Sequence, residues 1–264
     1  LLLAQKQHAL IFQDVKQIVL DEWHELMGNK RGVQVELALS RIKHIAQLNN
    51  NSIRIWAISA TIGNLEQAMQ VALGTDADNG VLVKADIQKQ IEVESVMPDE
   101  IERFPWAGHL GISMVSKVLP IIEQSNTTLL FTNTRAQSEI WYHALLDANP
   151  DLAGLIALHH GSVDAQLRQW IEDALHQGIL KVVVCTSSLD LGVDFRPVDT
   201  VIQVGSPKGV SRFLQRAGRS GHRPDAISKV YFLPTHSLEL AEAAALQDAI
   251  STQVMEHKEP VVLA

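Results

Sequence analysis

Two adjacent carboxylates, Asp21 and Glu22, follow directly on the three apolar residues 18–20. A short run of this kind is typical of a buried strand in a parallel sheet, and ligands bind such sheets beyond the carboxyl ends of the strands. In phosphoryl transfer, one carboxylate holds the Mg²⁺ that neutralises the phosphates, and a second group orients or deprotonates the attacking water. Taken alone, the pair fits equally well a strand that ends in a solvated acidic turn.

A second group of candidate residues is basic. Five of them are spaced four, four, three and four residues apart: Lys208, Arg212, Arg216, Arg219 and Arg223. On a helix these positions share one face, and no acidic residue interrupts them. A solvated basic face is the simple alternative. Because the chain carries a formal net charge of −8, we favour phosphate recognition, for which the arginine fork is well shaped.

The elements that must position these residues alternate along the chain as strand, polar tip and helix. This order indicates βαβ units and a parallel sheet, an α/β fold. Strands are expected at residues 17–20, 54–58, 81–83, 128–131, 155–158, 181–185, 200–204 and 230–233. Helices are expected at residues 35–46, 64–73, 112–122, 137–146, 164–176, 211–218 and 238–250. The polar stretch 87–105, with two prolines, is expected to separate two domains.

The polar residues that follow these strands should lie on the same side of their sheets. One cleft is therefore expected to gather Thr132, Arg135, His160, Thr186 and Asp194. Ser59 and Thr61 follow the strand at 54–58, where a hydroxyl can bond a neighbouring histidine or only cap the next helix. His159 and His160 do not predict zinc, because no cysteine or carboxylate stands at ligand spacing.

For two further residues the sequence predicts a position in the fold and no chemical role. Cys185, the single cysteine, ends an apolar run and is expected to be an inert core thiol. Trp23 stands between Glu22 and His24, a place that predicts a residue at the strand tip.

Composition limits the class of protein. The chain has 264 residues, 46% apolar and 20% charged, which is typical of a globular protein with one large domain or two ordinary ones. One cysteine allows no disulfide within the chain, so an intracellular setting is the default expectation. No apolar run approaches the length of a membrane span. With a net charge of −8, contact with nucleic acid must come from a local basic stripe.

Six short stretches that contain the candidate residues above resemble, in their order along the chain, motifs II, III, IV, IVa, V and VI of the superfamily 2 DEAD/DEAH-box helicases. The matching stretches are residues 21–24, 59–61, 131–135, 160–161, 186–194 and 215–223. Residues 21–26 (Asp-Glu-Trp-His-Glu-Leu) and 185–194 are most similar to the Lhr, or long helicase-related, group. Within this group the chain resembles the ligase-associated, bacterial DEXH-box branch.

The resemblance implies a role for each matching residue. Asp21 would hold Mg²⁺, Glu22 would be the general base, and His24 would couple the nucleotide to strand binding through Ser59 and Thr61. Gly192 and Asp194 would approach ATP, while Gln215 and Arg219 would face its γ-phosphate, Arg219 as the arginine finger. His222 stands where many relatives carry a second arginine, so its role relative to Arg223 stays open. Contacts with the DNA backbone would come from Thr132, Arg135, His160, Gly161 and Thr186.

The resemblance also implies a division into RecA-like domains. Residues 1–88 would be the C-terminal part of a first helicase domain, 89–255 a complete second one, and 256–264 the start of a following segment. No Gly-x-x-x-x-Gly-Lys-[Ser/Thr] sequence occurs, so the phosphate-binding loop is expected before Leu1.

The function implied is that of an ATP-dependent DNA helicase or translocase that moves 3′ to 5′ on a single strand in DNA repair. Its expected cofactors are ATP and Mg²⁺. Its expected partners are DNA and repair proteins such as a ligase. Its expected location is the bacterial cytoplasm, in association with the nucleoid. Three alternatives stay open. The chain alone could be a non-catalytic nucleic-acid-binding fragment, and its parent a duplex translocase or an RNA helicase.

Overall fold

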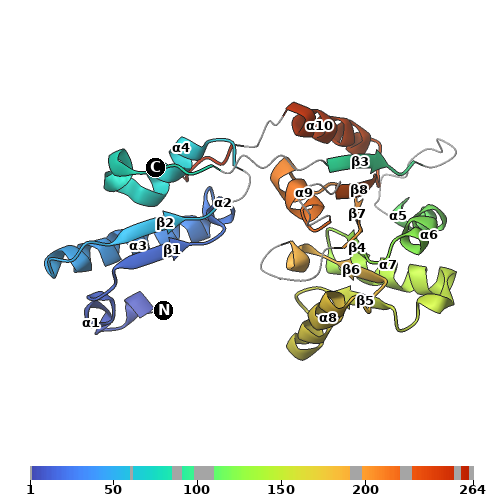
Figure 1. Ribbon diagram of the computed structural model, residues 1–264, viewed down its shortest axis with the longest axis horizontal. Helices are drawn as coiled ribbons and strands as arrows, with labels where there is room; N and C mark the ends of the chain where they lie inside the picture. Colours follow the sequence, from blue (N-terminus) through green and yellow to red (C-terminus); the bar gives the residue numbers. More distant parts are fainter. Residues whose placement is uncertain are drawn as a thin grey trace. The chain divides into compact units, whose positions relative to one another are not determined.

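The computed structural model describes residues 2–59, 62–84, 91–97, 110–190, 198–220, 228–252 and 257–261. The chain forms two compact units, one of residues 1–86 with 254–264 and the other of residues 87–253. Each unit is built on a parallel sheet (Figure 1). The α/β class expected from the alternating pattern is thus confirmed.

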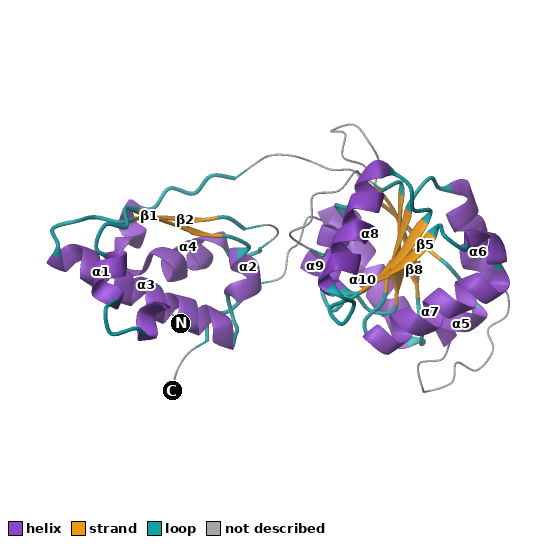
Figure 2. Ribbon diagram, turned by 90° about the horizontal axis from the view of Figure 1, so that it is seen from below, coloured by secondary structure: helices purple, strands orange, loops and turns teal. Residues whose placement is uncertain are grey.

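The first unit contains a two-stranded parallel sheet, in which β1 (Gln17–Leu20) pairs with β2 (Arg54–Ala57). Its helical segments are η1 (Leu2–Ala4), α1 (His8–Phe12), α2 (Trp23–Leu26), α3 (Lys30–Leu48), α4 (Leu65–Leu73) and η2 (Gly74–Asn79). The helices lie on one face of this sheet (Figure 2). Leu20, Leu39 and Ala68 are among the residues that form the core between sheet and helices.

The strands of this unit are less buried than their apolar character predicts. Val19 is 50% exposed and Trp56 59% exposed, because the helices cover one face and the described sheet has two strands. Residues 81–83, expected as a strand, form none. Val81 and Val83 are 84% and 87% exposed, since no strand pairs with them.

The second unit contains a six-stranded parallel sheet in the order β3-β8-β7-β4-β6-β5. The strands are β3 (Ile91–Ser95), β4 (Thr128–Phe131), β5 (Ile156–His159), β6 (Val182–Cys185), β7 (Thr200–Val204) and β8 (Ser228–Leu233). Every residue of β4, β6 and β7 is buried. The expected strands at 128–131 and 200–204 are confirmed residue for residue.

Helices cover both faces of this sheet (Figure 2). On one face lie α5 (Leu110–Ser113), α6 (Val115–Gln124) and α7 (Arg135–Ala148), and on the other α8 (Ala165–Gln177), α9 (Val210–Ala217) and α10 (Leu238–Thr252). Two short helical turns, η3 (Pro150–Leu152) and η4 (Ser187–Leu189), complete the described elements. Each face has its own buried core, one around Ile171 and Phe213 and the other around Val118 and Trp141.

One strand was not expected. Residues 91–95 lie within the stretch interpreted as a polar boundary, yet they form β3 and pair in parallel with β8. Their half-buried and exposed side chains alternate, Ile91 and Val93 inward, Glu92 and Glu94 outward. This is the period of an edge strand with one solvated face, a signal that the two glutamates concealed.

None of the helices in the described ranges combines the length and apolar character that a membrane span needs.

Candidate functional site

The two carboxylates lie at the carboxyl end of β1, as expected. Asp21 is exposed, and its Oδ1 accepts a hydrogen bond of 2.9 Å from the backbone N–H of Glu22. Glu22 has φ +50° and ψ +45°, the left-handed conformation that residues other than glycine rarely adopt. The next residue is held to the sheet because Trp23 N donates to Ile58 O over 2.9 Å. The tip of β1 therefore presents both carboxylates at an open end of the strand.

His24 lies immediately behind this tip and is 1% exposed. Its Nδ1 is 3.6 Å from Glu22 Oε2, and its Nε2 is 3.8 Å from Glu25 Oε1. Burial lowers the pKa of His24 below its ordinary value, while the two neighbouring carboxylates oppose the shift. The imidazole is therefore neutral near pH 7.

The expected partners of His24 are only partly described. Ser59 is half-buried, and its hydroxyl has no hydrogen-bond partner among the described residues. Thr61 lies outside them, so the coupling contact stays a prediction. The expectation that Trp23 lies at the strand tip is wrong. This residue is 1% exposed, and its indole N–H donates to Ala68 O over 2.9 Å, so it anchors α4 in the core.

The second unit brings several predicted nucleic-acid contacts to the carboxyl edge of its sheet. Thr132 follows β4 and Thr186 follows the neighbouring β6. Thr132 is fully buried, and its hydroxyl bonds Thr134 O at 3.2 Å. Its backbone N–H donates to Cys185 O over 2.8 Å, which ties this tip to β6.

A second cluster forms where β5 ends. The Arg135 guanidinium, on the first turn of α7, donates to Ser162 Oγ. His160 is 4% exposed, with its Nδ1 accepting from Ser162 N at 3.2 Å and its Nε2 3.4 Å from Glu139 Oε1. A side chain on Gly161 would come within 4.0 Å of Arg135 Nη2. Arg135 of α7 thus lies beside His160 and Gly161, which follow β5, while their contact with DNA stays a prediction.

The basic stripe is not the uniform phosphate surface that its spacing predicts. Arg216 is 2% exposed. Its Nε and Nη2 donate to the two oxygens of Asp190 over 2.8 and 3.1 Å, and its Nη1 donates to Gln203 Oε1 over 2.6 Å. The guanidinium also lies 4.7 Å from the centre of the Phe131 ring. Because α9 packs this position against the sheet, Arg216 is a buried ion-pair partner.

Asp190 organises the neighbouring arginines as well. Arg219 Nη2 donates to the backbone carbonyl of Asp190 over 2.6 Å, and Arg212 Nε is 3.5 Å from its Oδ2. Asp190 is itself 4% exposed. We did not single out this residue from the sequence, although a lone acid between Leu189 and Leu191 is a signal that a buried cation is near.

For the other predicted site residues, the structure describes little or nothing of the surroundings. Gln215 lies on α9, half-buried, one residue before Arg216. Gly192, Asp194, His222 and Arg223 lie outside the described residues, and their roles stay predictions. Cys185 is a free, buried thiol whose pKa is raised well above its ordinary value by burial, in agreement with an inert core residue.

With this geometry, comparison with known proteins identifies the family. Residues 1–68 match the DEAD/DEAH box helicase model, and residues 112–223 match the helicase conserved C-terminal domain model. The chain is 37% identical over 238 residues to the ATP-dependent helicase Lhr-Core protein 2 of Thermococcus barophilus, covering 88% of this chain and 27% of that protein. The chain belongs to the Lhr-like superfamily 2 helicases.

Two other Lhr proteins are also similar to this chain, one in sequence and one in structure. The Lhr helicase/uracil glycosylase of Escherichia coli is 29% identical over 93% of this chain and 18% of its own length. The structure of Mycobacterium smegmatis helicase Lhr bound to ssDNA and AMP-PNP has a TM-score of 0.82 at 27% identity, over 98% of this chain and 34% of that one. This Lhr-like chain thus spans about a quarter of the curated relatives it matches first, 27% in the first case. Its fold is RecA-like, as that neighbour indicates.

Proposed function

We propose that the protein that carries this Lhr-like chain is an ATP-dependent DNA helicase or translocase, which couples ATP hydrolysis to movement on single-stranded DNA. The observation that carries the proposal is the tip of β1, where Asp21 and Glu22 stand at the carboxyl end of a parallel strand. The similarity to ATP-dependent helicases of the Lhr-Core type, such as those of Thermococcus barophilus and Methanocaldococcus jannaschii, supports the same activity.

The chemistry of this tip fits a metal carried by the nucleotide. The described residues contain no group of three or more His, Cys, Asp or Glu side chains that could hold a metal ion. Mg²⁺ commonly uses one or two carboxylates, water and the substrate's own phosphates. An exposed Asp21 meets that need, and the bound Mg²⁺ would neutralise phosphate charge there.

Glu22 is suited to be the general base. Its side chain is 36% exposed, so water can reach it, while its backbone is held in one conformation between the Asp21 carboxylate and the sheet. Its neighbour His24 is neutral near pH 7, because burial lowers its pKa, so it does not lock the carboxylate in a strong ion pair. Glu22 can therefore take a proton from the attacking water.

Arg219 is proposed to stabilise the γ-phosphate in the transition state. Its guanidinium is half-buried and held by the Asp190 carbonyl. A cation held in place loses little freedom when the charge on the phosphate develops, which is the physical basis of an arginine finger. Gln215 of α9, four residues before Arg219, is proposed to contact the same phosphate, with His222 or Arg223 as a second contributor.

Nucleic acid is proposed to bind across the carboxyl edge of the six-stranded sheet. Arg135 and Gly161 are exposed there beside the buried His160. An arginine next to a glycine that leaves its backbone open is a suitable contact for a phosphate oxygen. Thr186, which is half-buried, would contact the strand with its hydroxyl, and Thr132 would order the tip of β4, since its side chain is buried and its backbone N–H bonds Cys185 O.

The finer assignments are proposals too. A role in DNA repair, a DNA ligase as partner, movement 3′ to 5′ and a cytoplasmic, nucleoid-associated location in bacteria rest on the resemblance of the chain to the ligase-associated branch of the Lhr group. Co-purification of DNA ligase with the tagged protein from its own cells would test the partner.

The activity is tested by replacing Glu22 with glutamine in the full-length protein. Glu22→Gln should reduce DNA-stimulated ATP hydrolysis by about 10²-fold or more, because general-base catalysis contributes that much. Glu66→Gln is the matched control, since Glu66 is an exposed carboxylate of the first turn of α4 to which no catalytic role is assigned. Turnover of Glu22→Gln equal to that of the control would remove Glu22 from its role.

A further inference from the structure

A cavity of about 340 Å³ opens at the carboxyl edge of the six-stranded sheet. It is lined by α5, by the first two turns of α7, and by Gly205 and Thr235, which follow β7 and β8. This volume is at the lower end of the range for small-molecule sites, about 300–1,000 Å³. It lies beside the residues proposed to contact DNA phosphates, but none of them lines it.

The position of the cavity in the sheet is one where α/β proteins bind ligands. β4 and β7 are neighbours, yet the chain leaves β4 through α7 towards β5 at one edge and leaves β7 through α9 towards β8 on the other side. Between strands whose connections depart in opposite directions, a crevice opens that commonly receives a ligand. Asn133 lines the cavity from the β4 side and Gly205 from the β7 side.

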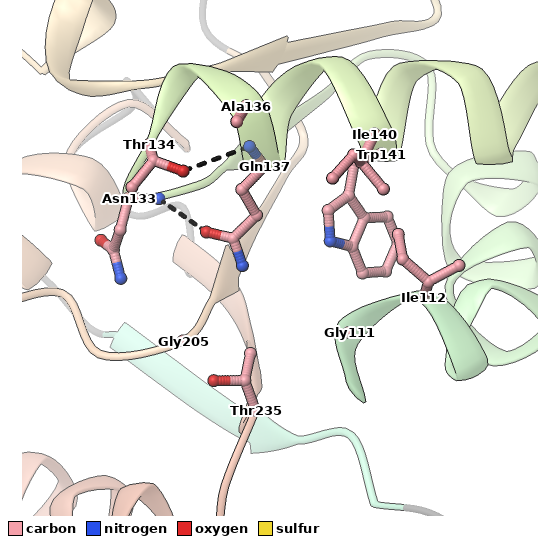
Figure 3. Close-up of a pocket in the computed structure, with 10 residues that line it drawn as sticks. All are labelled: Gly111, Ile112, Asn133, Thr134, Ala136, Gln137, Ile140, Trp141, Gly205 and Thr235. Carbon is pink, nitrogen blue, oxygen red and sulfur yellow. Dashed lines mark hydrogen bonds between the residues drawn. The ribbon is translucent and has the colours of Figure 1, made fainter. Parts of the chain in front are cut away.

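The lining is neutral and of two kinds. Ile112, Ile140 and the buried Trp141 form an apolar part. Gln137 reaches from α7 towards Thr235 and forms a polar part (Figure 3). Its Oε1 accepts from Asn133 N at 3.2 Å, which holds the amide in place. Among the described residues, no charged side chain lines the cavity, so its occupant is expected to be neutral, with a flat apolar surface and a hydrogen-bonding edge.

A charged group joined to such a neutral occupant has a place nearby. Arg135 lies on the same first turn of α7 as Thr134 and Ala136, but its guanidinium bonds Ser162 on the β5 side. One turn of helix thus presents a cation on one side and a neutral cavity on the other. A nucleotide unit has the matching composition, a charged phosphate joined to a neutral heterocycle.

We infer that this cavity receives one base of the bound strand, next to a phosphate held at Arg135. The inference rests on the proposed function and specifies how the strand is held. A base offers a hydrogen-bonding edge to the amide of Gln137 and flat faces to the apolar wall. The strand is then anchored at one nucleotide by its base as well as by its phosphates.

The test measures binding of the full-length protein to fluorescent single-stranded DNA, with a single abasic site moved along the oligonucleotide. Removing the base at one position should weaken binding about tenfold, in the range found for a base held by protein side chains. Ala136→Leu fills the cavity from an exposed helix position, and Gln137→Glu adds a charge but keeps the acceptor for Asn133 N. Both variants should bind the intact strand as weakly as the wild type binds the abasic one.

Ala148→Leu is the matched control, because Ala148 is an exposed alanine at the far end of the same helix. It should keep the wild-type response to the abasic site. If the intact strand binds in a salt-dependent way but no abasic position matters, or if the sensitive position stays sensitive in both cavity variants, the base site is refuted and the proposed function stands. If no strand binds at all, both are refuted.

Discussion

At the scale of the residue, one carboxylate determines how the basic stripe is arranged. Asp190 pairs with the buried Arg216, lies 3.5 Å from Arg212, and offers its carbonyl to Arg219. A buried arginine needs such a partner, because an unpaired charge away from water is costly. The pair therefore positions Arg219 indirectly, by holding the backbone from which the Asp190 carbonyl projects.

Replacing this carboxylate should destabilise the protein strongly. Asp190→Asn leaves Arg216 buried without its counter-charge, and we expect the free energy of unfolding to fall by about 3–5 kcal/mol, as for other broken buried pairs. Urea denaturation measures the change. Asp173→Asn, at an exposed position of α8, should stay within about 0.5 kcal/mol of the wild type. A similarly small effect of Asp190→Asn would show that the pair is not needed for stability.

A buried histidine should make stability depend on pH. His159 is 1% exposed, with its Nδ1 2.8 Å from Ser188 Oγ and its Nε2 3.1 Å from Glu172 Oε1. Burial lowers the pKa of His159 below 6.5, although Glu172 opposes the shift. The unfolded chain therefore binds a proton more readily than the folded one, and the free energy of unfolding falls as the pH drops below 6.5.

Comparison with His159→Gln isolates this contribution. Between about pH 7 and about pH 5, the wild type should lose stability more steeply than the variant. Urea denaturation at a series of pH values measures both slopes. His24, whose pKa is also lowered by burial, is present in both proteins and cancels in the difference. Parallel slopes would mean that His159 does not take part in the pH dependence.

At the scale of the element, capping residues define where the helices begin. Asn29 accepts hydrogen bonds from Arg31 N and Gly32 N, so α3 begins at Lys30, five residues before the apolar pattern of residues 35–46. Asp164 does the same for α8, with its Oδ1 accepting from Gln166 N at 2.9 Å and Leu167 N at 3.3 Å. Hydrophobic spacing locates the buried face of a helix, whereas side-chain acceptors determine its first turn.

The cap of α8 can be tested with a conservative pair of variants. Asp164→Ala removes the acceptor and should lower the free energy of unfolding by about 1 kcal/mol. Asp164→Asn keeps an oxygen in the same place, and Asn is about as good a cap as Asp, so it should cost little. Chemical denaturation of both proteins is the measurement. An equal loss in the two variants would point to the charge instead of the cap.

At the scale of the whole molecule, the net charge of −8 opposes binding of nucleic acid. The proposed binding must therefore come from local groups such as Arg135, which is exposed at the carboxyl edge of the sheet. Each neutralised phosphate releases counterions, so the affinity should fall steeply as salt is added.

Arg135→Ala should weaken binding of single-stranded DNA by a similar factor for all sequences. The slope of log affinity against log salt should decrease by about 0.7, the value for one phosphate contact on a single strand. Titrations at several salt concentrations measure it in the full-length protein. Lys229→Ala is the control of equal charge, near the amino end of β8 and exposed. Equal slopes for the two variants would exclude a specific contact at Arg135.

Several features could be predicted from the order of residues alone. The fully buried strands β4 and β7 are mostly apolar and are predicted to the residue, because a strand covered on both faces leaves few polar positions; the buried Gln203 of β7 is paired with Arg216. The edge strand β3 was missed, since its outward glutamates resemble a linker until β8 pairs with it. Residues 81–83 are the opposite case: this apolar run was expected to form a strand, but no described strand pairs with it.

The sequence by itself determined the α/β fold, the strand tips and the family, because these follow from local patterns of apolar and polar residues and from the types of residues at the tips. Only the tertiary structure decided which charges are available. Arg216 stands in a uniform basic stripe, yet it is buried against Asp190, whereas Arg135 and Gly161 meet beside His160 from separate elements. Burial and pairing depend on which elements pack together, and spacing along one helix does not contain that information.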